Sequence, residues 1–133
     1  MQLLLLLLLP VYTYGLLGSK KNVTVAGEFM CGGSPYKGIT VELWDDNTLN
    51  LDSKLGTTRT DGTGKFKIFG KTREIRDMKP YILAKHNCIN GRVDVRCLYT
   101  DRFDVPKGHQ GSMFNLGKVD LKSATKKRNT KCI

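Results

Sequence analysis

Histidine is scarce in this 133-residue sequence, and so are the residue patterns of catalytic sites. The two histidines, His86 and His109, lie at the end of an expected strand and in a glycine-flanked turn, where nothing orients them for acid–base catalysis. The chain has no G-x-S-x-G, P-loop or H-E-x-x-H motif, and the nearest stretch, Gly32–Tyr36, lacks the final glycine of a nucleophile elbow. We therefore expect hydrogen-bonding or solvated histidines, and no catalytic residue, cofactor or bound metal.

Metal-ligand spacing is missing as well. Zinc sites usually contain close cysteine pairs such as C-x₂-C, whereas gaps of 56, 8 and 34 residues separate the cysteines here. The acidic segment Asp45–Ser53 lacks the glycine and glutamate that a calcium-binding EF-hand loop requires. The even number of cysteines in an exported chain predicts two disulfides, and three pairings are possible. The cysteines are Cys31, Cys88, Cys97 and Cys132.

The sequence has no apolar run long enough to cross a bilayer. Its longest, Leu3–Leu9, is soon interrupted by Pro10. Although no Lys or Arg precedes it, this run is typical of a signal peptide cleaved after Gly15 or Gly18, and the alternative is a buried leucine helix. We expect a signal peptide over residues 1–18 and one secreted, extracellular domain over 19–133, with no transmembrane segment. Asn22 begins the one N-glycosylation sequon.

Helical periodicity is absent beyond the N-terminal leucines, and short runs of alternating apolar and polar residues predict strands instead. These runs are Val23–Phe29 continued by Cys31, Ile39–Leu43, Lys54–Thr60, Lys65–Phe69, Tyr81–His86, Cys97–Val105 and Met113–Leu121. Asp61-Gly62 predicts a hairpin turn between two of them. The charged stretch Lys71–Lys79 is expected to hold at most one helical turn, because Pro80 ends it. Trp44 falls opposite the aliphatic face of its strand, either packed beneath a loop, which we favour, or exposed for contact. We expect an all-β sandwich of seven or eight strands.

Asn90-Gly91 and the cysteines near it predict different loops. A two-residue turn at Asn90-Gly91 would place Cys88 opposite Val93, whereas a Cys88–Cys97 disulfide would centre the loop between Arg92 and Val93. A covalent link of suitable span outweighs a turn preference of about 1 kcal/mol or less. We therefore favour the disulfide and a longer loop.

Acidic residues are missing from the C-terminal segment Lys122–Ile133, which holds half of the formal net charge of +10. Its cations are Lys122, Lys126, Lys127, Arg128 and Lys131. Such a basic tail attracts acidic lipid head groups, sulfated glycans or acidic proteins, and export argues against nucleic acid. Because each cation near an acidic membrane contributes about 1 kcal/mol at best, we expect weak, salt-sensitive binding. The alternative is a solvated tail that aids solubility.

Five stretches of the chain carry a resemblance to a known family. They are Val25-Ala26-Gly27 with Cys31, Gly38–Leu43, Thr60–Phe66, Pro80–Leu83 leading to His86-Asn87-Cys88, and the terminal Cys132. In this order, behind a signal peptide, they resemble the nematode transthyretin-like family from Val23 to Cys132. The acidic position that usually precedes the last cysteine is replaced by Asn129-Thr130-Lys131.

The resemblance implies a transthyretin-like (prealbumin-like) sandwich of two antiparallel sheets, with the disulfides Cys88–Cys97 and Cys31–Cys132. Roles described in the family include a secreted protein that bridges phosphatidylserine on dying cells to a phagocyte receptor. The chain ends Asn129–Ile133 and lacks the C-terminal Tyr-Arg-Gly-Ser motif of the related hydroxyisourate hydrolases. We expect a secreted, non-enzymatic binding or adaptor protein whose partner is an extracellular receptor or an anionic lipid or glycan surface. The alternative is a carrier of a small apolar ligand in an oligomeric channel, as in transthyretin.

Overall fold

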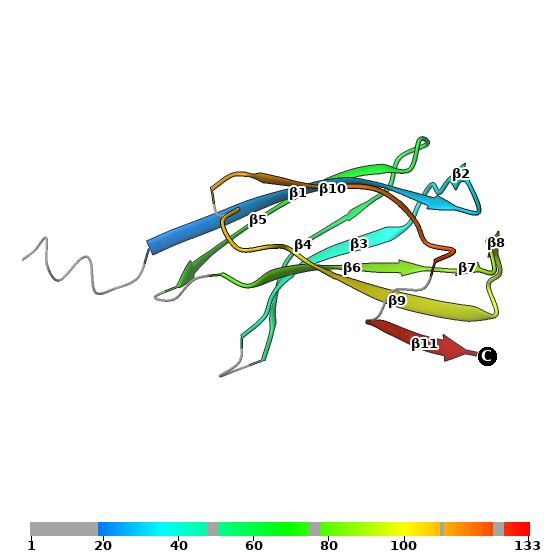
Figure 1. The fold of residues 1–133 in the computed structure, drawn as a ribbon. Coiled ribbons are helices and arrows are strands. Elements are labelled where there is room, and N and C mark those ends of the chain that lie inside the picture. The colour runs from blue at the N-terminus through cyan, green and yellow to red at the C-terminus, as the bar shows by residue number, and fades with distance from the viewer. Residues whose placement is uncertain (1–18, 48–50, 75–77, 110, 124–126) are drawn as a thin grey trace, which may run out of the picture.

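The computed structural model describes residues 19–47, 51–74, 78–109, 111–123 and 127–133. The predicted signal peptide, residues 1–18, and Lys126 of the predicted tail lie outside the described residues. Within these ranges the chain forms strands, and no helix is long and apolar enough to cross a bilayer. The strands build two stacked sheets (Figure 1).

The first sheet has β1 (Ser19–Cys31) at its centre. β1 pairs antiparallel with β5 (Lys65–Glu74) and parallel with β10 (Met113–Asp120), and β2 (Ser34–Pro35) extends one end. The second sheet is antiparallel and has the order β11-β9-β6-β3-β4. Its strands are β3 (Thr40–Asp45), β4 (Ser53–Arg59), β6 (Pro80–His86), β9 (Cys97–Asp104) and β11 (Arg128–Cys132). β7 (Cys88–Ile89) and β8 (Arg92–Val93) form a small hairpin. The predicted all-β sandwich of two sheets is confirmed, and the short strands bring the count to eleven over the described ranges.

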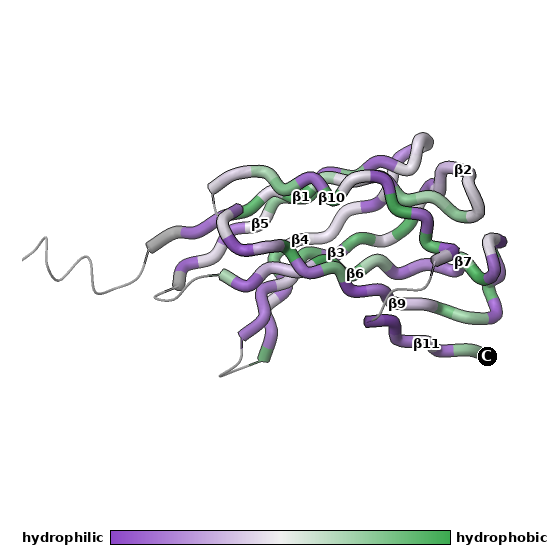
Figure 2. Tube along the Cα trace, in the orientation of Figure 1, coloured by the Kyte–Doolittle hydropathy of each residue, from purple (hydrophilic) through white to green (hydrophobic). Residues whose placement is uncertain are grey.

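The core lies between the sheets because alternate residues of each strand point inward. Val23, Val25 and Phe29 of β1 are fully buried, as are Leu43 of β3 and Ile82 of β6. Burying each such side chain contributes about 1.5–3 kcal/mol. Hydrophobic and hydrophilic positions are interspersed along the strands (Figure 2). The inward faces follow the alternation that the sequence predicts.

The Asp61–Gly64 turn joins the two sheets and does not close the predicted hairpin. β4 pairs with β3, and β5 pairs with β1. The turn itself forms as expected, because the Gly64 N–H donates to the Asp61 carbonyl at 3.0 Å and the Asp61 carboxylate accepts the Thr63 and Lys65 N–H groups. Asp-Gly located a turn, but a local turn does not determine which strands pair beyond it.

The disulfides are Cys31–Cys88 and Cys97–Cys132, so the predicted pairs Cys88–Cys97 and Cys31–Cys132 are wrong. Cys31–Cys88 ties the end of β1 in the first sheet to the hairpin that follows β6. Cys97–Cys132 joins β9 to β11 within the second sheet. The bonds span 57 and 35 residues, and each stabilises the fold by about 4 kcal/mol in the chain-entropy account.

The Asn90-Gly91 turn is the reason for this pairing. Asn90 and Gly91 have φ angles of 53° and 80°, the left-handed conformations of a type I′ turn. The resulting β7–β8 register places Cys88 opposite Val93, which is the alternative to the predicted Cys88–Cys97 loop. Cys97 lies beyond this hairpin and faces the C-terminal strand. The turn preference prevailed because both cysteines have other partners within reach.

Candidate functional site

A buried ion cluster lies where β6, β9 and β11 meet. His86 Nε2 is 2.8 Å from Asp101 Oδ2, and both side chains are fully buried. Arg128 donates to Asp101 through Nε at 2.6 Å and Nη2 at 2.7 Å. Because the Cys88 N–H donates to His86 Nδ1, the network assigns the His86 proton to Nε2, which donates to Asp101. Burial raises the pKa of Asp101, but the hydrogen bonds from Arg128 and His86 outweigh burial and hold that pKa below its ordinary value.

Within the predicted basic tail, Arg128–Cys132 forms β11, an edge strand of the second sheet. The Arg128 side chain is only 14 % exposed and is committed to the buried cluster, so a surface-binding role for it is wrong. Lys127 pairs with a carboxylate of β9, whereas Lys122 and Lys131 are exposed. Of the four described tail cations, two therefore already have acidic partners. For Lys122, Lys126, Lys127 and Lys131, a surface role stays a prediction.

The outer face of the first sheet gathers cations that the predictions from sequence do not bring together. β5 continues to Glu74, so Lys71 and Arg73 belong to a strand and not to a helical turn, while residues 75–77 lie outside the described residues. Lys118 of β10 lies on the same face and pairs with Glu28 of β1 at 3.5 Å. We call this surface the basic face. It consists of Lys65, Lys67, Phe69, Lys71 and Arg73 of β5, Met113 and Lys118 of β10, and Thr24 and Glu28 between them on β1.

Two exposed apolar side chains cross the basic face in one row. Phe69 of β5 and Met113 of β10 both lie opposite Thr24 in register, and they are 54 % and 52 % exposed. Neighbouring strands are about 4.8 Å apart, so the two backbones are separated by about 10 Å. Lys67 and Lys71 lie two positions to either side of Phe69, about 6.6 Å away along the strand. This surface presents apolar groups between cations.

Other predicted residues lie at the edges of these features. Asn22, the predicted glycosylation site, lies opposite Lys71 on β1, and its glycosylation stays a prediction. The His109 ring packs edge-on against Phe114, with ring centroids 4.8 Å apart. Trp44 is half-buried and stacks on Tyr81, with centroids 6.5 Å apart. Trp44 is thus covered from a neighbouring strand of its own sheet.

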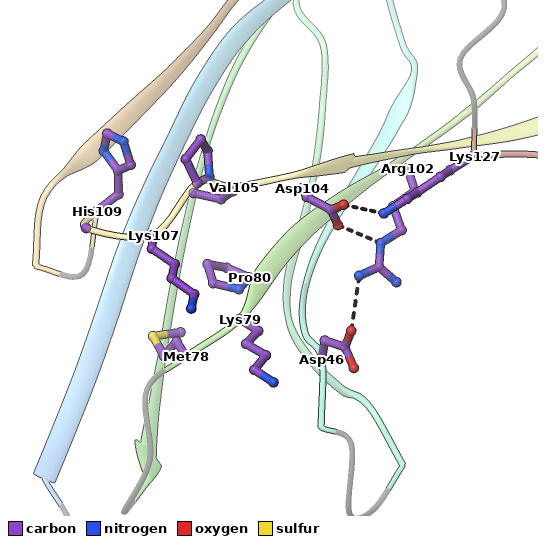
Figure 3. A pocket seen from close by; sticks show the side chains of 12 residues that line it. Asp46, Met78, Lys79, Pro80, Arg102, Asp104, Val105, Lys107, His109 and Lys127 are labelled. Atoms are coloured by element: carbon purple, nitrogen blue, oxygen red, sulfur yellow. Dashed lines mark hydrogen bonds and ion pairs between the residues drawn. The ribbon is translucent and has the colours of Figure 1, made fainter.

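A cleft of about 590 Å³ opens beside the start of β6 and the end of β9 (Figure 3). On one wall, Arg102 donates to Asp104 at 2.8 Å and to Asp46 at 3.2 Å, and Lys127 also pairs with Asp104. Burial lowers the pKa of Arg102, but these carboxylate bonds outweigh it and raise that pKa above its ordinary value. Over the described residues, no group of three His, Cys, Asp or Glu side chains is placed to hold a metal ion.

Comparison with known proteins identifies the family. The model of the transthyretin-like family matches residues 26–106, from β1 to just beyond β9. This chain belongs to the transthyretin-like family. The matched segment includes β5 of the basic face and ends before β10 and β11.

Similar proteins include several family members from Caenorhabditis elegans. Transthyretin-like protein 16 is 30% identical over 112 residues, which cover 84% of this chain and 83% of that protein. Transthyretin-like protein 2 is 30% identical over 114 residues, which cover 81% and 76%. Among solved structures, a 9R-lipoxygenase from Cyanothece aligns with a TM-score of 0.53 at 17% identity, over 77% of this chain and 16% of the lipoxygenase. The structural likeness shows the fold alone.

Proposed function

We propose that this protein is a secreted, non-enzymatic binding or adaptor protein that docks on anionic lipid surfaces through the basic face. The observation that carries the proposal is the row of Phe69 and Met113, in which Phe69 lies between Lys67 and Lys71. Cations attract acidic head groups, and exposed apolar side chains enter the boundary between head groups and acyl chains. Secretion is supported by the two disulfides, which persist in oxidising compartments.

The magnitudes show that charge and apolar contact are both needed. Five cations near an acidic membrane contribute about 5 kcal/mol at most, and salt screens this attraction. Burying the exposed half of a phenylalanine, roughly 100 Å², adds about 2.5 kcal/mol. The attraction of the cations and the burial of the phenylalanine together contribute about 8 kcal/mol at most, which corresponds to a micromolar dissociation constant. The apolar row also favours lipid over a sulfated glycan, which offers Phe69 and Met113 no apolar phase.

Docking through the first sheet is compatible with an adaptor role. The outer faces of the two sheets of a sandwich point in opposite directions. A lipid surface on the basic face therefore leaves the outer face of the second sheet, which includes the half-buried Trp44, accessible to a protein receptor.

Vesicle co-sedimentation tests the proposal. Vesicles of phosphatidylcholine with and without phosphatidylserine are compared over a salt series. The protein used carries no glycan at Asn22, since Asn22 pairs with Lys71 across the sheet and a glycan there would cover the basic face. The charge reversal Lys67→Glu with Lys71→Glu should weaken binding by at least about tenfold. Phe69→Ala should weaken binding by at least about tenfold and leave its salt dependence intact.

The matched control reverses two exposed cations of the predicted tail, Lys122→Glu with Lys131→Glu. It changes the net charge by the same amount, so an effect of net charge alone would reduce binding equally in both double variants. A larger loss in the tail variant, or equal binding of the wild type to neutral and acidic vesicles, would overturn docking through the basic face.

A further inference from the structure

The cleft beside β6 and β9 has an apolar floor. Met78, Pro80 and Val105 are buried in its lining, and Pro106 completes this side. Its volume of about 590 Å³ lies within the range of about 300–1,000 Å³ that is usual for small-molecule sites. None of its lining residues belongs to the basic face, so the cleft is a separate feature of the molecule.

Backbone hydrogen bonds fix the walls of the cleft. The Lys79 N–H donates to the buried carboxylate of Asp45 at 2.9 Å. The Asp46 N–H donates to the Lys79 carbonyl at 3.0 Å, and the Val105 N–H donates to the Pro80 carbonyl at 3.0 Å. These bonds join the start of β6 to the strands on either side of it. The cleft is therefore formed before any ligand enters, which reduces the entropy that binding must offset.

The charges around the cleft do not balance. Arg102 and Lys127 are matched by the carboxylates of Asp46 and Asp104. Lys79 and Lys107 are exposed, and within the described part of the chain neither has an ion-pair partner. Figure 3 shows their side chains on either side of Pro80. Two ammonium groups that have no acidic partner among the described residues thus border an apolar floor.

We infer that this cleft binds a small amphipathic organic anion, with its carboxylate at Lys79 and Lys107 and its aliphatic or aromatic body on Met78, Pro80 and Val105. An ammonium group is a compact point charge, and it binds a carboxylate by donating hydrogen bonds without requiring a bidentate geometry. A neutral ligand would leave the two cations unmatched, and an inorganic anion would leave the apolar floor in water. The combination selects a molecule that carries both parts.

Titrations of ¹⁵N-labelled protein with hexanoate, hexanol, acetate and inorganic phosphate test this inference. Hexanoate should shift the amide signals of Val105 and His109 saturably in the millimolar range. Hexanol, acetate and phosphate should each bind about tenfold more weakly, because each lacks either the charge or the apolar body. Hexanol or phosphate binding as tightly as hexanoate would overturn the amphipathic assignment.

The variant Lys79→Ala with Lys107→Ala should weaken hexanoate about tenfold and leave hexanol unchanged. Both side chains are exposed, so the fold should persist, and the unchanged amide spectrum away from the cleft checks this. Lys122→Ala with Lys131→Ala removes two exposed cations elsewhere and should leave hexanoate binding as in the wild type. Equal weakening in both double variants would show attraction by net charge only and would overturn the site.

Discussion

Replacing Arg128 with alanine tests whether the C-terminus is held as a strand. Arg128 donates two hydrogen bonds to Asp101 and a third to the Leu121 carbonyl at 3.0 Å. Its loss leaves a fully buried carboxylate without its cation, a change that costs about 3–5 kcal/mol. We expect Arg128→Ala to lower the free energy of unfolding by this amount at pH 7, a large share of the roughly 5–15 kcal/mol of a typical domain.

The effect of Arg128→Ala should depend on pH with a defined sign. In the wild type, the pKa of Asp101 is lower in the folded than in the unfolded chain. Its contribution is therefore complete above the unfolded pKa of about 3.9 and is lost as the pH falls through the folded pKa. In the variant, Arg128 no longer offsets the effect of burial, so the pKa of Asp101 in the folded protein rises. Protonation of Asp101 then removes the unpaired buried charge. The difference between the two proteins should be largest near pH 7 and shrink below about pH 4.

Guanidinium unfolding with intact disulfides, followed by the fluorescence of Trp44, the one tryptophan, measures both quantities. Lys131→Ala changes an exposed cation on the same strand and should cost less than about 0.5 kcal/mol. The double variant Asp101→Asn with Arg128→Gln should be more stable than Arg128→Ala, because it leaves no unpaired buried charge. A loss below about 1 kcal/mol at pH 7, or one that is constant with pH, would refute a buried ion pair at this site.

Two further predictions concern the turns. Proteolysis without reduction, followed by mass spectrometry, should release peptides joined by Cys31–Cys88 and Cys97–Cys132, and a Cys88–Cys97 peptide would contradict the β7–β8 register. Gly64→Ala should lower the melting temperature and cost about 1–3 kcal/mol, since φ is +79° and a Cβ would lie 2.3 Å from a β1 carbonyl oxygen. Gly62→Ala, where a Cβ meets nothing within 4 Å, should be nearly neutral by comparison.

The inward faces of the strands could be predicted from the sequence because alternation is a local property. Val23, Val25 and Phe29 are buried as their spacing indicates, since successive side chains of any strand point to opposite faces. Strand pairing is a different kind of information. The turn at Asp61-Gly62 is local, but the partners of β4 and β5 depend on residues far away in the chain.

The C-terminal strand could not be predicted because it does not cover the core. β11 is largely hydrophilic (Figure 2), so it shows no alternation of apolar residues. It is held instead by its backbone pairing with β9, by Cys97–Cys132 and by the Arg128–Asp101 contact. Each of these joins residues at least 27 positions apart. The sequence predicts a hydrogen-bonding or solvated role for His86, and it cannot name the partner, Asp101, because Asp101 lies on a different strand.

The position of cations in a β-protein depends on their spacing more than on their density. The segment Lys122–Ile133 has five cations and no acidic residue, yet forming a strand from Arg128 onward turns that side chain inward. Along β5, cations recur at every second position on both sides of Phe69, so all of them face the same way. A period-two pattern of lysines interrupted by one aromatic residue is therefore the sequence signal that locates the basic face.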